Sequence, residues 1–243
     1  MSRLLLISNS TVHGRGYLDH VESEIRDFVE NRTRTVFVPY ALHDRGAYSA
    51  QAANRLREMG LEFTSVHDVS NTSRAIEHSE IIFIGGGNTF RLLQDLHKNQ
   101  LIEPIRRAVR AGALYIGSSA GSIVACPSLK TTKDMPVVQP MSFEALSLVP
   151  FQISPHYLDP DPSSTHMGET QEQRIQQFLE ENEEVVVGLR EGSFLRVEQD
   201  GVTLKGPHSA RIFRIGVPPV EMSSGANLNG LLVPQVLSAG LVA

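Results

Sequence analysis

The sequence predicts an α/β protein with a doubly wound, mainly parallel sheet flanked by helices. Short apolar runs alternate with amphipathic segments through the first half of the chain, and several of these segments end at a glycine. Two glycine-rich turns also follow directly after apolar runs, as they do at strand-to-helix junctions. Repeated strand–helix units of this length favour parallel strands joined by crossovers, with helices on both faces of the sheet.

The elements of this first half are expected where each pattern begins and ends. The expected strands are Arg3 to Ser8, Thr35 to Val38, Glu62 to Ser65, Ile81 to Ile84 and Leu114 to Ile116. The expected helices are Leu18 to Glu30, Tyr48 to Met59, Thr72 to His78, Thr89 to Leu96 and Ile102 to Arg110. Gly60 and Gly112 follow two of these helices, at the position where a C-terminal cap favours glycine.

The second half of the chain has a different pattern. Prolines interrupt the segment from Met135 to Pro162, which is therefore expected to be mostly loop. Thr170 and Gln173 have the spacing of a capping box and predict a helix through Glu180. The short strands expected beyond it form a small antiparallel C-terminal extension of the main sheet: Val185 to Leu189, Phe194 to Val197, Val202 to Leu204 and Ile212 to Ile215. The tail, 217–243, carries one charged residue, Glu221, and no role is assigned to it.

Length, charge and cysteine content restrict the class of protein. The chain has 243 residues and a formal net charge of −5, which suits one α/β domain over 1–243. A net negative charge gives the protein no excess positive potential, so neither nucleic acid nor a membrane is expected as a partner. The single cysteine, Cys126, is expected to be a buried structural thiol. No apolar run reaches the roughly 18 residues of a membrane span, and residues 4–7 are too short a run for a signal peptide. The expected setting is the cytoplasm, and the protein partner considered is a second copy, in a homodimer.

The segment from Gly117 to Gly121 is the strongest indication of chemistry. It has the pattern G-x-S-x-G between two apolar runs, 114–116 and 123–125, and predicts a strand, a tight turn and a helix. Such a turn holds its central serine in a sharp bend, beside the N–H groups that begin the helix. Ser119 is therefore the candidate nucleophile, with a simple polar turn of glycine and serine as the alternative.

A nucleophilic serine needs a base, and the base needs an orienting acid. His156 follows a proline in an extended loop and is the candidate base, with His166 as a rival. Glu191 follows an apolar strand and precedes a glycine, which places it at the carboxyl end of that strand. It is the candidate acid, and Asp134 is the alternative.

A second glycine-rich turn, Gly85-Gly86-Gly87-Asn88-Thr89, follows the run that ends at Ile84. Glycines allow backbone N–H groups to approach a ligand oxygen at the start of the next helix, so this turn could complete an oxyanion hole. It lacks the lysine of a phosphate-binding loop and the spacing of a dinucleotide fingerprint, which disfavours phosphate or NAD. The histidines and the cysteine show no metal-ligand spacing, so no metal and no cofactor are expected.

These motifs together resemble the peptidase E family, the α-aspartyl dipeptidases among the serine peptidases. The resemblance spans about Leu4 to Ile215 and implies a class I glutamine amidotransferase-like fold with Ser119, His156 and Glu191 as a catalytic triad. The chain order Ser, His, Glu differs from the Ser, acid, His order of α/β-hydrolases, which disfavours an esterase. The motifs that carry the resemblance are Gly85 to Phe90, Gly112 to Gly117, Ser119 to Gly121, Ala125 to Pro127, Asp134 to Pro136, Pro155-His156 and Gly168 to Thr170.

The resemblance also implies the reaction, which is hydrolysis of dipeptides with an N-terminal aspartate through an acyl-enzyme on Ser119. Backbone N–H groups of Gly86 or Gly87 and of Ala120 would hold the oxyanion, with Asn88 in the same turn. Two alternatives remain: a cyanophycinase-like enzyme that cuts other aspartyl bonds, and a non-catalytic binder of small molecules.

Such a substrate needs a cation for its side-chain carboxylate and an acid for its α-ammonium. We expect Arg174 to bind the carboxylate, with an ion pair to Glu172 or Glu181 as the alternative. Asp134 or Glu169 would then hold the ammonium.

The chain departs from the family pattern directly before the nucleophile, where Ser118 stands in place of a bulky tryptophan. We expect this change to enlarge the pocket or make it more polar.

Overall fold

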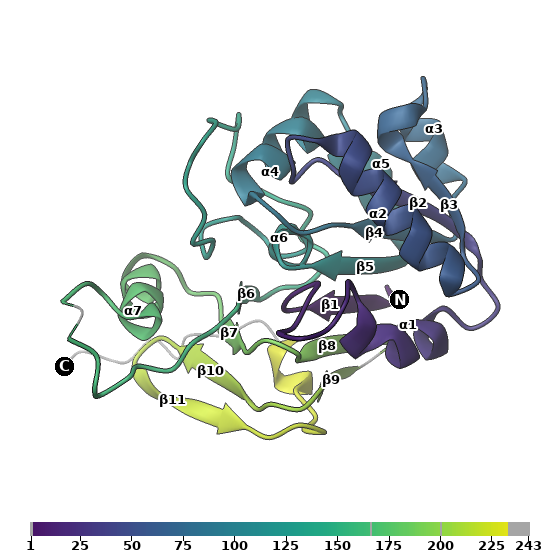
Figure 1. Ribbon diagram of the computed structural model, residues 1–243. Coiled ribbons are helices and arrows are strands. Elements are labelled where there is room, and N and C mark those ends of the chain that lie inside the picture. The colour runs from purple at the N-terminus through teal and green to yellow at the C-terminus, as the bar shows by residue number, and fades with distance from the viewer. Residues whose placement is uncertain (1, 166, 200, 233–243) are drawn as a thin grey trace.

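The computed structural model describes residues 2–165, 167–199 and 201–232. A seven-stranded sheet runs in the order β3-β2-β4-β5-β1-β8-β9, and its first five strands are mutually parallel (Figure 1). The last two strands pair in an antiparallel manner. The expected strands of the first half are confirmed. The bounds are β1 Leu4–Ile7, β2 Arg34–Val38, β3 Glu62–Ser65, β4 Ile81–Ile84, β5 Leu114–Ser118, β8 Phe194–Glu198 and β9 Gly201–Lys205.

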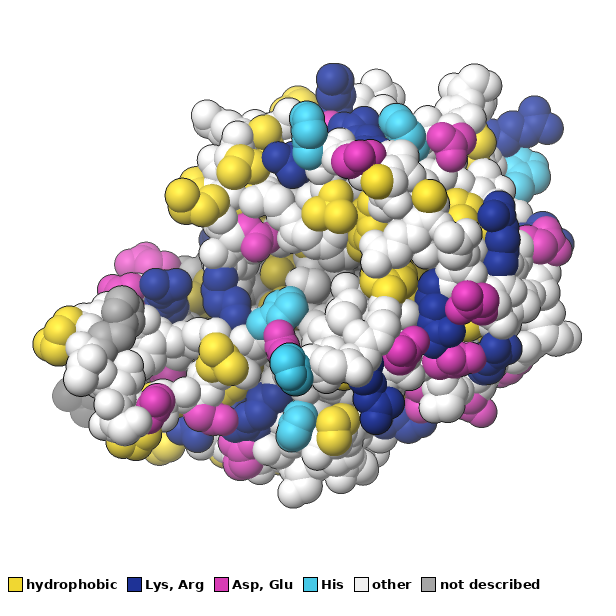
Figure 2. Space-filling model, in the orientation of Figure 1, with side chains coloured by type: hydrophobic (Ala, Val, Ile, Leu, Met, Phe, Trp, Pro, Cys, Tyr) yellow, Lys and Arg dark blue, Asp and Glu magenta, His cyan; other side chains and the backbone are white. Residues whose placement is uncertain are grey.

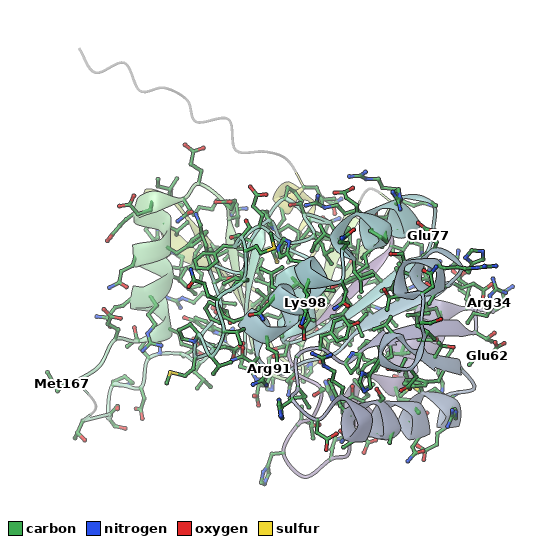
Figure 3. All side chains as sticks on the ribbon, turned by 90° about the horizontal axis from the view of Figure 1, so that it is seen from above. Arg34, Glu62, Glu77, Arg91, Lys98 and Met167 are labelled. Carbon is green, nitrogen blue, oxygen red and sulfur yellow. The ribbon has the colours of Figure 1, made fainter. Side chains whose placement is uncertain are left out.

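Helices cover both faces of this sheet because its central strands are apolar on both sides. In β5, Leu114 and Ile116 pack toward α1 and α2, while Tyr115 packs toward α4, α5 and α6. The bounds are α1 Glu22–Val29, α2 Arg45–Glu58, α3 Thr72–Glu77, α4 Thr89–Lys98, α5 Ile102–Arg110 and α6 Ala120–Val124, with short 3-10 turns at Asp19–Val21, Val66–Asp68 and Asn229–Leu231. Charged side chains such as Arg34, Glu62 and Glu77 lie at the periphery (Figure 3). None of the helices in the described part of the chain combines the length and apolar character needed to cross a membrane.

A second sheet of four strands lies beside the first, in the order β11-β10-β7-β6 (Figure 1). Its strands β6 and β7 are parallel, and the other pairs are antiparallel. Helix α7, Gln171–Glu181, begins at the predicted capping box and packs Ile175 and Leu179 against Phe213 of this sheet. The bounds are β6 Gln152–Pro155, β7 Val186–Leu189, β10 Ala210–Arg214 and β11 Val217–Met222.

The second half of the chain therefore differs from its predicted arrangement. The expected single antiparallel extension is divided, because β8 and β9 continue the main sheet whereas β7 and β10 belong to the second one. Strand β7 is apolar on both faces, with Val187 in the main core and Val186 under α7, so it needs cover on both sides.

Two strands lie in segments that the sequence analysis did not assign as strands. Strand β6 lies in the segment expected to be loop. Its apolar pattern is short and is interrupted by Pro155. Strand β11 begins the tail, and its Pro218 and Pro219 are tolerated because it is an edge strand. The rest of the tail, from residue 233, lies outside the described residues.

Close backbone contact positions the turn that carries Ser119. A Cβ atom at Gly121 would lie 2.1 Å from the carbonyl oxygen of Ile84, at the end of β4. A Cβ at Gly117 would lie 2.5 Å from the carbonyl oxygen of Gly121. Both glycines of the G-x-S-x-G pattern are thus required by packing, and β4, β5 and α6 meet where Ser119 stands.

We expect Gly121→Ala to destabilise the protein, because the added methyl group must push α6 away from β4. Overpacking of this kind costs about 1–3 kcal/mol, and the loss should appear as a lower midpoint in urea denaturation followed by circular dichroism. The control is Gly46→Ala in α2, where the new Cβ finds its nearest atom 3.7 Å away. This variant should be at least as stable as the parent chain, because alanine favours helix. An unchanged midpoint for Gly121→Ala would contradict the close contact.

Candidate active site

Ser119 stands in a strained turn between β5 and α6. Its φ and ψ are 51° and −109°, a conformation that non-glycine residues rarely adopt. The backbone N–H of Ser119 donates to the carbonyl of Ile7 at 2.9 Å, and Ser122 Oγ donates to the same carbonyl at 2.8 Å. The carbonyl of Ile7, at the end of β1, therefore fixes the turn that carries Ser119. The side chain of Ser119 stays partly exposed and available for reaction.

Three side chains that the sequence analysis selected form one continuous hydrogen-bonded chain. Ser119 Oγ lies 2.9 Å from His156 Nε2, and His156 Nδ1 lies 2.6 Å from Glu191 Oε1. A carboxylate only accepts, so Nδ1 carries the proton and Nε2 is free to accept the hydroxyl proton of Ser119. Histidine and acidic side chains lie next to each other near the centre of the face in Figure 2. The geometry is that of a nucleophile, its base and an orienting acid.

The backbone of His156 is also strained and is held at both its polar groups. Its φ is 51°, in the left-handed region. Its N–H donates to Ser8 Oγ at 2.9 Å, and its carbonyl accepts from Lys133 Nζ at 2.9 Å and from Gln171 Nε2 at 3.1 Å. Ser8 Oγ in turn donates to the carbonyl of Leu189, at the end of β7, at 2.8 Å. Three side chains from separate parts of the chain thus fix the backbone of His156.

Glu191 is positioned by the residue that follows Ser8. The side-chain oxygen of Asn9 accepts from the N–H of Gly192 at 2.7 Å, and Gly192 adopts φ 80° in the turn. Ser8 and Asn9 are both buried at the carboxyl end of β1. The sequence analysis did not select them. The available signal was the polar pair that directly follows the apolar run of β1, at the sheet edge where sites form.

The glycine-rich turn after β4 lies against Ser119. A Cβ at Gly86 would come within 3.1 Å of Ser119 Cβ, and one at Gly87, with φ 132°, within 2.7 Å of the carbonyl oxygen of Ala41. Burial raises the pKa of Tyr48, and hydrogen bonds with Tyr17 and with the Gly86 backbone partly oppose this rise. The backbone of Gly86 is therefore already engaged by Tyr48. Among the described residues, no acceptor is paired with the N–H of Gly87 or of Ala120. Of the two glycines expected at an oxyanion hole, Gly87 is therefore the one with a free donor.

Asn88 has a structural task that the sequence analysis did not assign to it. Its side-chain oxygen caps α4 by accepting from the N–H of Arg91 at 3.0 Å. Its side-chain nitrogen donates to the carbonyl of Met135 at 2.8 Å. Both polar atoms of Asn88 are thus used to anchor α4 and the loop near residue 135.

The carboxylate of Asp134 also serves the start of α4. Its Oδ2 accepts from Thr89 N at 2.7 Å, from Thr89 Oγ1 at 2.6 Å and from Thr132 Oγ1 at 3.1 Å. A carboxylate at the positive end of a helix is stabilising. The alternative that Asp134 orients the base is wrong, because Glu191 makes that contact with His156. The rival histidine, His166, lies outside the described residues.

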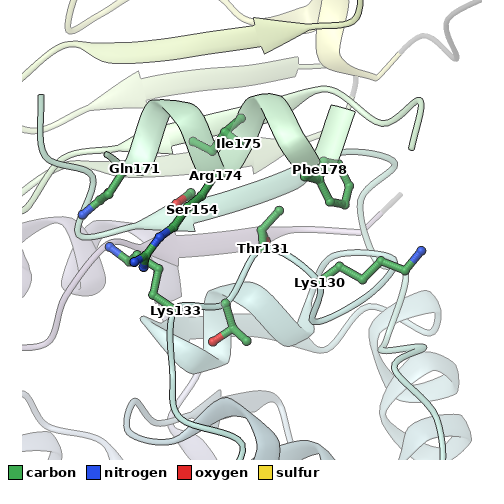
Figure 4. A pocket seen from close by; sticks show the side chains of 9 residues that line it. Lys130, Thr131, Lys133, Ser154, Gln171, Arg174, Ile175 and Phe178 are labelled. Atoms are coloured by element: carbon green, nitrogen blue, oxygen red, sulfur yellow. The ribbon is translucent and has the colours of Figure 1, made fainter. Parts of the chain in front are cut away.

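A small cavity with a cationic lining lies between α7 and the loop after α6. Its volume is about 70 Å³, and it contains no acidic side chain (Figure 4). Arg174 lines it and pairs with Glu169 at 3.7 Å, so the alternative of an ion pair with Glu172 or Glu181 is wrong. Glu172 instead pairs with Arg211 of β10, at 3.2 Å. The lining residues are Lys130, Thr131, Thr132, Lys133, Ser154, Gln171, Arg174, Ile175 and Phe178.

Ser118 and Cys126 are both fully buried. The hydroxyl of Ser118 has no hydrogen-bond partner among the described residues, and the side chain does not reach the surface. Burial raises the pKa of the Cys126 thiol, which fits a structural role. Within the described ranges, no group of histidine, cysteine and acidic side chains could hold a metal ion.

Comparison with known proteins finds a matching family model, similar named proteins and a solved structure of the same fold. The family model described as "Peptidase family S51" matches residues 4–205. A protein named "Peptidase E" from Streptomyces coelicolor is 51% identical over 229 residues, which cover 94% of each chain. A protein of Drosophila melanogaster named "Probable alpha-aspartyl dipeptidase" is 44% identical over 232 residues, 94% of this chain and 97% of that one. The crystal structure of a peptidase from an acI-B1 Actinobacterium has the same fold, with a TM-score of 0.70 at 15% identity, covering 94% of this chain and 96% of the other.

We expect Ser8→Ala to lower the free energy of unfolding, because it leaves the His156 N–H without an acceptor, whereas the Leu189 carbonyl still accepts from the N–H of Tyr157. An unpaired buried N–H costs about 1–3 kcal/mol, and thermal denaturation would measure the loss. The matched control is Ser79→Ala. The Ser79 hydroxyl meets the carbonyl of Ile76, which also accepts the Ser79 N–H, so its loss should cost little. Equal stability of both variants would refute the role assigned to Ser8.

Proposed function

The chain belongs to peptidase family S51, and we propose that this peptidase is a serine dipeptidase acting on dipeptides with an N-terminal aspartate. The observation that carries the proposal is the hydrogen-bonded chain from Ser119 through His156 to Glu191. The names of the relatives support the substrate class, since one of them is called an alpha-aspartyl dipeptidase.

The proposed reaction has two steps on Ser119. In the first, Ser119 Oγ attacks the peptide carbonyl carbon while His156 Nε2 takes the hydroxyl proton. His156 then gives that proton to the leaving amino group as the peptide C–N bond breaks, which leaves an acyl-enzyme. In the second step water attacks the ester, with His156 again as base, and releases aspartate. Glu191 keeps Nδ1 protonated and stabilises the imidazolium in both steps.

The developing negative charge on the carbonyl oxygen requires fixed donors. We assign these to the backbone N–H groups of Ala120 and Gly87, with Gly86 as the neighbouring alternative. The free donors at Gly87 and Ala120 favour the first pair. Donors of this kind lower the barrier without any rearrangement at the moment of reaction.

Recognition of aspartate is assigned to the cationic cavity. Arg174 would bind the side-chain carboxylate, and an acidic side chain would hold the α-ammonium. Glu169 is the favoured acid for the α-ammonium, because it already lies beside Arg174. Asp134 is the alternative, and only its second carboxylate oxygen is left for the α-ammonium.

We also propose two broader properties. The fold falls in the class I glutamine amidotransferase-like group, a placement supported by the family resemblance and by the parallel part of the sheet. The enzyme works in the cytoplasm, which is supported by a single buried cysteine that cannot form an internal disulfide.

We expect Ser119→Ala to abolish hydrolysis of Asp-Leu, with kcat reduced by about 10³-fold or more, because the acyl-enzyme cannot form. The parent enzyme should give a covalent adduct with a serine-directed phosphonate, detected by mass spectrometry, and the variant should not. Parallel kinetics on Glu-Leu, Asn-Leu and a tripeptide with N-terminal aspartate would define the substrate class. Retention of most activity by Ser119→Ala would rule out this mechanism.

We expect Arg174→Met to raise KM for Asp-Leu about tenfold with a smaller change in kcat, because it removes one cation from the carboxylate site. Arg110→Met on the exposed end of α5 removes the same charge far from the cavity and should leave both constants unchanged. Unchanged kinetics for Arg174→Met would remove Arg174 from the substrate site.

A further inference from the structure

Lys133 brings a positive charge directly to the residue that contacts Ser119. Its ammonium donates to the carbonyl oxygen of His156 at 2.9 Å, beside the bond from Gln171 to the same oxygen. One residue, His156, therefore separates the lysine ammonium from the serine hydroxyl. The sequence analysis did not select Lys133, which is next to Asp134 in a short polar loop.

The ammonium of Lys133 has donors to spare. It carries three N–H groups, and one of them is used on the His156 carbonyl. Among the described residues, no carboxylate lies within ion-pair distance of Lys133, although the chain has 27 acidic residues and most arginines near the site are paired. The side chain of Lys133 stays partly exposed, so its free donors can be reached by an anionic ligand, and no carboxylate in the described part of the chain occupies them.

The cavity beside Lys133 is suited to a small anionic group. Lys133 and Arg174 extend toward each other across it (Figure 4), and its wall contains hydroxyl and amide groups but no acid. Its volume of about 70 Å³ is roughly half of the 150 Å³ that holds a benzene molecule, so it fits a carboxylate rather than a large side chain.

We propose that Lys133 is a specificity-determining residue whose ammonium binds the side-chain carboxylate of the substrate's N-terminal aspartate. This inference rests on the proposed function. One N–H of Lys133 stays on the His156 carbonyl, and the others meet the carboxylate, which Arg174 contacts from α7. The same lysine then links recognition of aspartate to the position of the base. Asparagine in place of aspartate offers no negative charge and gives Lys133 no ionic partner.

The charge on Lys133 responds to pH within a range that kinetics can reach. Burial lowers the pKa of Lys133 to about 8, with Asp134 and Glu191 opposing this change and Arg174 adding to it. His156 also faces the ammonium through its carbonyl. Because the folded pKa is below the ordinary value, the charge is present below pH 8 and is lost as the pH rises through it. The preference for aspartate over asparagine should fall over the same range.

The test compares kcat/KM for Asp-Leu and Asn-Leu in the parent enzyme and in Lys133→Met. A charge-assisted hydrogen bond to a carboxylate is worth about 1.5–3 kcal/mol, so the ratio of the two constants should fall about tenfold to a hundredfold. The loss should be mainly in KM for Asp-Leu, with the constants for Asn-Leu little changed. Titration of each substrate's α-ammonium is the same with the parent enzyme and the variant, so it cancels when the two enzymes are compared on one dipeptide.

Lys98→Met is the matched control, because Lys98 is exposed at the end of α4 and does not line the cavity. This variant removes the same charge and should keep the ratio within about twofold, which is below 0.5 kcal/mol.

Lys133→Arg provides the second measurement, since it keeps the charge even if Lys133→Met folds poorly. Its ratio should stay close to that of the parent enzyme at pH 7 and should no longer fall between pH 7 and 9, because arginine does not titrate there. If Lys133→Met instead lowers kcat equally on both dipeptides, the lysine only positions His156 and the inference is wrong. The inference is also wrong if the ratio in Lys133→Arg falls with pH as in the parent. Failure of the parent enzyme to cleave either dipeptide would instead refute the proposed function itself.

Discussion

The hydroxyl of Ser8 is the contact on which the arrangement of the site depends. It accepts from the N–H of His156 and donates to the carbonyl of Leu189, so it joins the end of β1 in the main sheet to β6 and β7 in the second. The main sheet supplies Ser119 and the second sheet supplies His156 and Glu191. A serine and a histidine from separate sheets can remain 2.9 Å apart only if the two sheets are fixed to each other at that edge.

Backbone strain and close packing work together at this edge. Ser119 and His156 both have φ 51°, and strain of this kind costs about 1–3 kcal/mol at each residue. Their surroundings offset that cost with hydrogen bonds from β1, from Lys133 and from Gln171, and with glycines at 117 and 121 that let α6 touch β4. The strain exposes the serine hydroxyl and directs the imidazole toward it, so it serves the geometry of the site.

The loop that carries Lys133 is anchored on both sides, which makes its cation a fixed part of the site. Thr131 donates to the carbonyl of Ile153 in β6 at 2.8 Å, and Asp134 caps α4. The chain has a net charge of −5, yet the cavity at this loop has only cations among its charged lining residues. An anionic substrate is therefore met by local charge rather than by the overall field, and this favours selectivity at short range over long-range attraction.

The sequence alone determined the parallel half of the fold and the turn at Ser119. Through family motifs it also identified His156 and Glu191 as the partners of Ser119. These features are recorded in local periodicity and in glycine positions, because a strand, a helix or a tight turn depends on residues close in the chain. Only the tertiary structure placed β6 beside β7, gave Asn88 and Asp134 their capping roles, and brought Ser8 and Lys133 to His156. The bond between Ser8 and His156 spans 148 positions, and a contact at that separation leaves no pattern in either segment. Such contacts are decided by how the sheets pack, which no local stretch of sequence encodes.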